Sequence, residues 1–173
     1  MHLLSVSDAD DIETLEEGLV IVLDPGYFSV DWVAMQGRSL RKGSSGTSHK
    51  AMSRVLEEAS RLICVDVDSD NASSKEALEN AVRNGKETVL VFGERIEIKP
   101  FLEKAIKAVA PQAMSSLRQA VREEERGADI VLLAGGGGEV FSEVAREAFP
   151  RSRIVVPESP VMANARGFWF YGS

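Results

Sequence analysis

Two carboxylates, Asp24 and Asp31, flank a short turn that contains Gly26 and Ser29. The turn follows an apolar run, so Asp24 stands at the end of a predicted strand. Backbone N–H groups of such a turn, together with the Ser29 hydroxyl, can hold a phosphate group, and an aspartate at the strand end can orient Mg²⁺ through water. The same pattern also fits an ordinary Asp/Pro/Gly turn that binds nothing.

A second candidate is the run of four glycines, Gly135–Gly138, which separates an apolar segment from an amphipathic one. Glycine has no Cβ, so the backbone of such a loop can approach a ligand closely. The N–H groups at the start of the following helix favour an anion. A nucleotide suits this combination, although four glycines alone equally fit a tight strand-to-helix turn without a ligand.

Two common nucleotide-binding motifs are missing from the glycine run. The third place of the dinucleotide fingerprint holds Val140 or Phe141 instead of Gly or Ala, depending on the register. No Gly-x-x-x-x-Gly-Lys-Ser/Thr sequence is present either. A Rossmann-type cofactor binder is therefore disfavoured. Tight binding of NAD in preference to ATP would support this alternative.

The predicted elements place both candidate segments at strand ends, and the first two strands form a β-hairpin. Strands are predicted at 18–24, 29–35, 39–41, 88–92, 94–99, 128–134 and 153–156. Helices are predicted from Thr47 or Ser48, after a Gly/Ser connector at 43–46, to about Arg61, and over 74–84, 101–126 and 139–148, with a kink or division at Pro111. A separate short apolar segment is expected at 63–67.

Length and composition predict one soluble globular domain, because the chain has 173 residues, of which 44% are hydrophobic and 27% charged. A net charge of −7 gives no positive field for direct binding of nucleic acid or an anionic membrane. No apolar stretch is long enough to span a bilayer and no signal-peptide core is present, so a cytoplasmic protein is expected.

Several other residues are expected to be structural. The single cysteine, Cys64, lies in an apolar run and is predicted to be buried. His2 and His49 have no further ligands at metal-binding spacing, so a zinc site is not expected. The aromatic residues near the C-terminus, which include Trp169, are predicted to pack in the core or against another domain.

Taken in order, these motifs resemble a known superfamily. A strand, Asp-x-Gly-x-x-Ser-x-Asp, a strand, helices, and then a strand, a glycine run and a helix are similar to the second half of the actin, heat-shock chaperone and sugar kinase superfamily. The segment 160–168, Pro-Val-Met-Ala-Asn-Ala-Arg-Gly-Phe, is similar to the ends of plasmid-segregation actins of the ParM/StbA type. The segment 24–32 also resembles the StbA-like members of PRTRC plasmid systems.

The resemblance implies an α/β fold of the ribonuclease-H-like actin type, with a mixed sheet, a β-hairpin phosphate loop and flanking helices. Residues 1–173 would form a single domain, equivalent to domain II of that superfamily. The implied core subdomain covers about 17–43 and 127–173, and the implied outer subdomain covers about 44–126. The first phosphate loop of the superfamily has no counterpart in residues 1–16.

The resemblance also implies roles for the site residues, with ATP and Mg²⁺ as ligands. The hairpin loop would bind the β- and γ-phosphates, and the glycine run would border adenosine and ribose. Asp24 would act on the Mg²⁺ shell, and Asp31 would hold the loop or the metal-bound water. The implied phosphate and nucleoside contacts are Gly26, Tyr27, Phe28, Ser29, Gly135, Gly136, Gly137 and Gly138.

The implied function is that of the C-terminal nucleotide-binding domain of an actin-like ATPase, which forms filaments for plasmid or DNA segregation and works with a DNA-binding adaptor protein. Hydrolysis would require the N-terminal half as well. The alternative is an actin-like assembly module that does not turn over nucleotide. Pro25 and Tyr27, which replace residues that are often small in such phosphate loops, favour that alternative.

Overall fold

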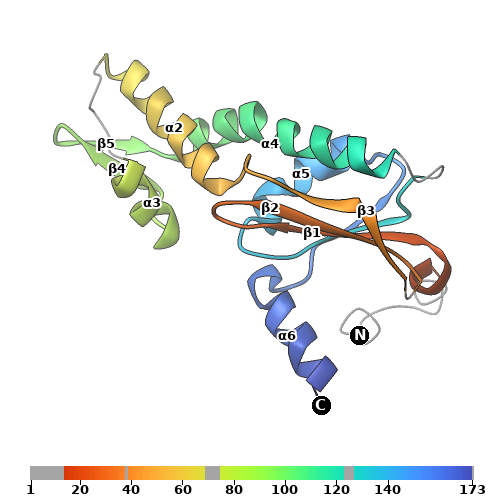
Figure 1. The fold of residues 1–173 in the computed structure, drawn as a ribbon. Helices are drawn as coiled ribbons and strands as arrows, with labels where there is room; N and C mark the ends of the chain where they lie inside the picture. The colour runs from red at the N-terminus through yellow and green to blue at the C-terminus, as the bar shows by residue number, and fades with distance from the viewer. Residues whose placement is uncertain (1–13, 38, 69–74, 123–126, 173) are drawn as a thin grey trace.

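The central element of the molecule is a mixed sheet with the strand order β3-β2-β1-β6-β7, seen in a computed structural model (Figure 1). The structure describes residues 14–37, 39–68, 75–122 and 127–172. The strands of this sheet are β1 (Leu19–Pro25), β2 (Val30–Gln36), β3 (Ser39–Ser48), β6 (Ile130–Leu133) and β7 (Arg153–Val155).

Strand β1 pairs with β2 in antiparallel register and with β6 in parallel register. It therefore lies inside the sheet, which agrees with its nearly continuous apolar sequence and its mostly buried side chains. The parallel pairing aligns Leu23 with Leu133, so β1 and β6 end at the same edge of the sheet. Both candidate turns begin at that edge.

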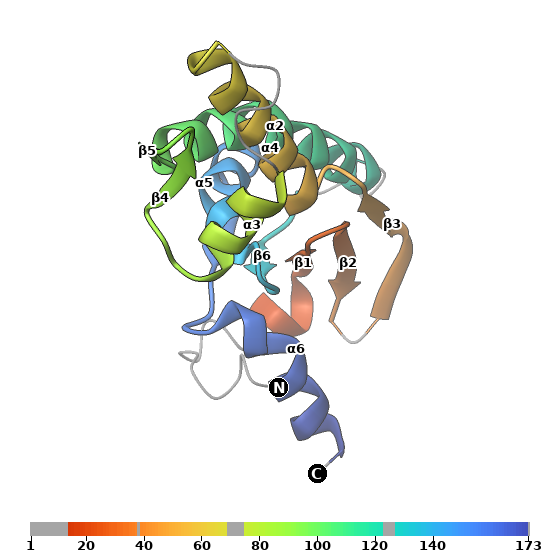
Figure 2. The same ribbon diagram turned by 90° about the vertical axis from the view of Figure 1, so that its left-hand side faces the viewer.

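Two helices, α4 (Lys99–Val121) and α5 (Gly138–Ala148), cover one face of the sheet (Figures 1 and 2). Their apolar side chains share one core with the inward-facing residues of β1, β2 and β6. Fully buried members of this core include Leu19, Leu23, Leu117, Leu133 and Phe141. The burial of these large apolar groups is the main force that holds the sheet against the helices.

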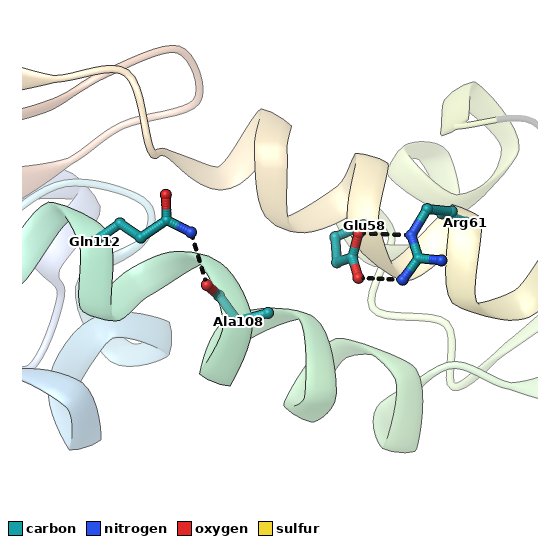
Figure 3. A network of polar contacts seen from close by, with 4 residues as sticks. All are labelled: Glu58, Arg61, Ala108 and Gln112. Atoms are coloured by element: carbon teal, nitrogen blue, oxygen red, sulfur yellow. Dashed lines mark hydrogen bonds and ion pairs between the residues drawn. The ribbon is translucent and has the colours of Figure 1, made fainter.

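Helix α4 continues through Pro111, so the predicted division of this helix is wrong. Proline removes one backbone donor from the helix. Close by, the side-chain amide of Gln112 donates to the carbonyl of Ala108 at 3.0 Å (Figure 3). The last part of the predicted helix, 123–126, lies outside the described residues.

A second apolar cluster lies beyond one end of the sheet and joins four further elements. These are α2 (Met52–Asp66), α3 (Lys75–Arg83), β4 (Thr88–Val91) and β5 (Glu94–Glu97), the last two forming a small antiparallel pair. The first half of α4 packs in this cluster, and its second half packs against the sheet. The division into two subdomains stays a prediction, and α4 contributes to both cores.

The surface of α2 carries a bidentate ion pair. The Arg61 guanidinium donates to both carboxylate oxygens of Glu58, at 2.7 and 2.9 Å (Figure 3). These hydrogen bonds hold the pKa of Glu58 below its usual value. The pair is exposed, so its contribution to stability is small.

Strand β3 is longer than the sequence pattern predicts, and the predicted helix start at Thr47 or Ser48 is wrong. The Gly/Ser stretch pairs with β2 as far as Ser48, which lies opposite Val30. The reason is Trp32, whose ring lies so close to Gly46 that an added Cβ would come within 2.7 Å of it. The indole N–H of Trp32 also donates to the Ser44 carbonyl at 3.0 Å.

Helix α2 begins at Met52 and runs to Asp66, so the apolar residues from Ile63 onward are its last turn and not a separate segment. Ile63 faces the second core, whereas Val65 is 66% exposed. Cys64 is half-buried, so the prediction of a buried cysteine is only partly met. Helix α3 ends at Arg83, and the predicted terminator Gly85 follows it with φ +64°, which lets the N–H groups of Gly85 and Lys86 bond back to the last turn.

The C-terminal helix α6 (Pro160–Gly172) extends away from the sheet on the side opposite α4 (Figures 1 and 2). The Trp169 side chain is 75% exposed, so it is not part of the core, and its packing against another domain stays a prediction. Among the helices in the described part of the chain, none is long and apolar enough to cross a membrane.

Candidate functional site

The hairpin turn at 26–29 and the glycine turn at 135–138 lie against each other at the carboxyl ends of β1 and β6. The N–H of Ala134 donates to the carbonyl of Leu23 at 2.7 Å and continues the parallel ladder. The N–H of Gly137 then donates to the carbonyl of Pro25 at 2.8 Å. Two segments that are far apart in the sequence are thus joined by backbone hydrogen bonds at one sheet edge.

The protein's own packing requires glycine at two of the four positions, Gly135 and Gly137, and leaves little room at Gly138. Gly135 has φ +73°, and an added Cβ would overlap the Asp24 carboxylate. A Cβ on Gly137 would lie 2.7 Å from the Pro25 carbonyl oxygen, and one on Gly138 would lie 3.1 Å from Cβ of Pro160. Gly138 is buried and forms the first residue of α5, whereas the sequence placed it in the loop.

Gly136 differs from its neighbours, because an added Cβ there would meet no protein atom within 4 Å. The residue is exposed at the tip of the turn. Protein packing therefore explains three glycines and leaves the fourth without a structural requirement. Gly136 is the position where the close approach of a ligand would explain the absence of a side chain.

The two candidate carboxylates face each other across the hairpin. Asp24 and Asp31 are opposite residues in the register of β1 and β2, so their side chains lie on the same face of the sheet. The Ser29 hydroxyl donates to Asp31 at 2.6 Å, and the Asn164 amide donates to Asp24 at 2.7 Å. Each carboxylate thus has a neutral hydrogen-bond donor that fixes its orientation.

This arrangement fits Mg²⁺ held through water and phosphate better than an all-protein metal site. No group of three or more His, Cys, Asp or Glu side chains with metal-binding geometry occurs among the residues that the structure describes. Magnesium commonly takes one or two carboxylates and completes its shell with water and substrate phosphates. Two like charges opposite each other on a partly exposed face match that donor set.

The hairpin turn is also bonded to α2. The N–H groups of Met52 and Ser53 donate to the carbonyls of Gly26 and Tyr27, at 3.3 and 2.8 Å. Helix α2 has no side-chain cap, so these carbonyls satisfy two donors that its first turn leaves open. Inside the turn, the N–H of Gly26 donates to the Ser29 carbonyl at 2.8 Å.

The two aromatic side chains of the turn leave it in different ways. The Tyr27 hydroxyl donates to Glu79 on α3 at 2.5 Å, whereas Phe28 is 75% exposed. The hydrogen bond to Glu79 raises the pKa of Tyr27, because it stabilises the protonated phenol next to a carboxylate. The predicted phosphate contact of Tyr27 therefore rests on its backbone, since its hydroxyl is bonded to α3.

Sequence reasoning did not assign Asn164 or Glu79 to the site. Asn164 lies within the segment quoted for the superfamily resemblance, but no local signal pairs it with a residue 140 positions away. Glu79 lies one helical turn after Lys75 and one turn before Arg83, which is the pattern of an exposed helix face. Only the tertiary fold shows that these side chains meet the hairpin.

A separate groove of about 510 Å³ lies between α4 and α5. It is lined by Met114, Arg118, Val144 and Glu147 among others. This groove is on the helix-covered face of the sheet, whereas the acidic pair and both turns are at the ends of β1 and β6. Its size therefore does not make it the better candidate, because the groups with site chemistry are elsewhere.

No protein-family model and no curated protein sequence matches the chain. Solved structures do match it. The archaeal actin homolog Ta0583 in complex with ADP has a TM-score of 0.77 and 16% identity, over 99% of this chain and 53% of the homolog. A 15-stranded ParM filament from Clostridium botulinum has a TM-score of 0.76 and 18% identity, over 94% of this chain and 48% of that one.

A third match is Bacillus thuringiensis ParM with ATP, with a TM-score of 0.61 and 13% identity, over 89% of this chain and 46% of ParM. The fold is that of an actin-type, ribonuclease-H-like domain. At these identities the similarity establishes the actin-type fold, which confirms the predicted fold class. The chain spans about half the length of the proteins it matches.

Proposed function

We propose that the chain is the C-terminal nucleotide-binding domain of an actin-like ATPase that assembles into filaments for plasmid or DNA segregation. The observation that carries the proposal is the junction of the hairpin turn and the glycine turn, with Gly136 open and two carboxylates beside it. Similar structures solved with ATP, with ADP and as a filament support it. Self-association into filaments, a DNA-binding adaptor and a cytoplasmic location belong to the same proposal.

The proposed contacts with the nucleotide come from both the hairpin turn and the glycine turn. Gly26 and the Ser29 hydroxyl, with the backbone of Tyr27 and Phe28, would hold the terminal phosphates. The glycine turn would lie against ribose and adenosine, with Gly136 in closest approach. Asp24 and Asp31 would hold the water shell of Mg²⁺, and this cation would neutralise charge on the phosphates when bound.

Turnover would depend on more than this chain. A closed cleft excludes water from the phosphates and positions the attacking water, and one actin-type domain supplies only one wall of such a cleft. We therefore expect the 173-residue chain to fold, to bind ATP weakly and to hydrolyse it negligibly. Rapid Mg²⁺-dependent hydrolysis by this chain alone would contradict the two-domain site.

The test is titration calorimetry of the full-length gene product with ATP and Mg²⁺, with a matched pair of variants. Gly136→Val should weaken nucleotide binding while the melting temperature changes little, because the added side chain enters the ligand's space and its Cβ meets no protein atom within 4 Å. Glu143→Gln, an exposed change on α5, serves as the control. Unchanged affinity of a folded Gly136→Val variant would remove the glycine turn from the site.

Asp24 allows a second test, which separates binding from chemistry. Asp24→Ala should lower the rate of hydrolysis more than the affinity for ATP, because a carboxylate that orients Mg²⁺ acts mainly on charge that develops at the γ-phosphate. Steady-state hydrolysis and a binding titration on the same protein measure both. Turnover equal to that of the wild type would reduce Asp24 to a turn residue.

A second candidate function is an actin-like assembly module without nucleotide turnover. The observation that favours it is the bulky hairpin turn, in which Tyr27 is bonded to α3 and Pro25 is bonded to the glycine turn. Sedimentation of the full-length gene product with and without ATP separates the two functions. Assembly that is independent of nucleotide, with no phosphate release, would favour the module.

A further inference from the structure

The side chain of Tyr27 crosses from the hairpin turn to α3. Its hydroxyl donates to Oε2 of Glu79 at 2.5 Å, and the other oxygen of Glu79 accepts from Arg83 at 2.6 Å. Glu79 is therefore held between a phenol and a guanidinium. On the same helix face, the Lys75 ammonium lies 5.9 Å from the centre of the Tyr27 ring, within range of a cation–π contact.

These contacts place one side of α3 against a single residue of the turn. Lys75, Glu79 and Arg83 are spaced by four residues, so they share one face of the helix. That face meets Tyr27 with a carboxylate at its centre and a cation on either side. Tyr27 also packs against the second apolar cluster, which joins α2, α3, β4 and β5.

The backbone of the same turn is bonded to two other elements. The carbonyls of Gly26 and Tyr27 accept hydrogen bonds from the first turn of α2, and the carbonyl of Pro25 accepts one from the glycine turn. The turn is thus held from α2 and from the glycine turn by its backbone, and from α3 by the side chain of Tyr27. A shift of the turn would have to strain or break the contact with Glu79.

We propose that Tyr27 is a positioning residue whose hydrogen bond to Glu79 joins α3 to the hairpin turn, so that a terminal phosphate bound in the turn also fixes the position of α3. The phosphate part rests on the proposed function, whereas the hydrogen bond does not. Tyr27 touches the ligand only through its backbone, and its hydroxyl acts on α3. The hydrogen bond between Tyr27 and Glu79 therefore couples the position of the hairpin turn to that of α3.

The first experiment measures the link without nucleotide, by hydrogen–deuterium exchange of the chain with peptides that cover 75–83. Tyr27→Phe keeps the ring and removes only the hydroxyl, so exchange across α3 should rise roughly threefold to tenfold, the effect of losing one hydrogen bond. Glu79→Gln keeps an acceptor oxygen and should stay closer to the wild type. Glu87→Gln, an exposed change outside α3, is the control.

A double variant decides whether the two residues act through each other. If the bond is the link, Tyr27→Phe combined with Glu79→Ala should raise exchange no more than Glu79→Ala alone, because the bond is already lost. Additive effects of the two changes, or α3 exchange in Tyr27→Phe equal to that in the wild type, would overturn the proposal. Thermal melts of all variants show that each remains folded.

The second experiment adds ATP and Mg²⁺ at saturating concentrations to the full-length gene product and to its Tyr27→Phe variant. In the wild type, nucleotide should slow exchange in both the hairpin turn and α3. In Tyr27→Phe, the turn should still be protected while the protection of α3 is lost, which a merely structural residue would not produce. Equal protection of α3 in both proteins would overturn the link.

Failure of the proposed function would look different. If the wild type binds no nucleotide, the proposed function and the phosphate part of the link are both wrong. The exchange measured without nucleotide would still decide whether Tyr27 and Glu79 join the turn to α3. The two results are therefore distinguishable.

Discussion

Two β-hairpins in the described part of the chain, β1–β2 and β4–β5, have turns with very different surroundings. The turn between β1 and β2 is bonded to α2, to α3 and to the glycine turn, and it carries the candidate site. The turn between β4 and β5 has two residues, Phe92 and Gly93, both with positive φ, at 48° and 87°. Phe92 is 74% exposed and Leu90 is 63% exposed.

The two turns obtain their backbone geometry in different ways. The β4–β5 turn is a local structure of the type that requires two residues with positive φ, and Gly93 supplies one of them without strain. Phe92 supplies the other against its own preference. The first turn is instead held by hydrogen bonds to α2, to α3 and to the glycine turn.

The largest change in stability is expected from Gly135→Ala, at the junction of the first hairpin turn with the glycine turn. The new Cβ would overlap the Asp24 carboxylate, and the φ of +73° is unfavourable for alanine. We expect a loss of about 2–4 kcal/mol in the free energy of unfolding, measured by denaturant titration. The junction of the two turns would loosen with it.

Gly136→Ala is the matched control for Gly135→Ala, one residue along the same turn. Its Cβ would meet no protein atom, and its φ is not in the left-handed region, so stability should change by less than about 1 kcal/mol. Similar losses for both variants would mean that the two glycines do not differ as the structure indicates.

Alkaline pH provides the next largest effect. The pKa of Tyr27 is raised in the folded protein, so its contribution to stability is fully present below the unfolded value of about 10 and is lost as pH rises through the folded value. The charged groups in contact with the phenol are Glu79, Lys75 and Arg83, the last through Glu79.

As the pH rises from about 9 to about 11, across the usual pKa of a phenol, the wild type should lose more stability than Tyr27→Phe, since the variant has no phenol to ionise. Urea unfolding at several pH values measures the difference, and comparison of the two proteins cancels the titration of the lysines. Parallel pH profiles for the two proteins would show that the Tyr27 hydroxyl does not contribute to stability.

A smaller change in stability, of opposite sign, is expected in the β4–β5 hairpin. Phe92→Asn replaces a residue strained at positive φ by one that adopts this conformation readily. Because the Phe92 side chain is mostly exposed, little apolar burial is lost. We expect a gain of about 0.5–1 kcal/mol in the free energy of unfolding, measured by thermal melting. Destabilisation would show that Phe92 makes contacts that its exposure does not suggest.

The smallest effect is expected on α6, which the first hairpin holds through Asn164 and Asp24. Trp169→Ala should change stability by less than about 0.5 kcal/mol, because the side chain is exposed in this chain. The same change should matter more in the full-length gene product if Trp169 packs against another domain. A large loss of stability in the 173-residue chain would place Trp169 in its core after all.

Local signals in the sequence account for much of the fold. The apolar run of β1 predicts a strand inside the sheet, Gly85 predicts the end of α3, and the glycine run predicts a strand-to-helix turn. These features are set by side-chain periodicity and by φ values that only glycine adopts easily, and both can be read over a few residues. The errors at β3 and at the start of α2 arose where pairing with β2 and the Trp32 ring keep the Gly/Ser segment extended as far as Ser48.

Part of the candidate site could also be predicted from the sequence, and part of it could not. Asp24, Asp31 and the four glycines could be selected as candidate site residues from their types and their spacing along the chain. Only the tertiary structure decided that the turns meet, that Gly136 alone among the four glycines is free of packing, and that Tyr27 is bonded to Glu79. The physical reason is that the pairing of β1 with β6 and the approach of α3 depend on contacts between segments far apart in the chain, which local propensity does not encode.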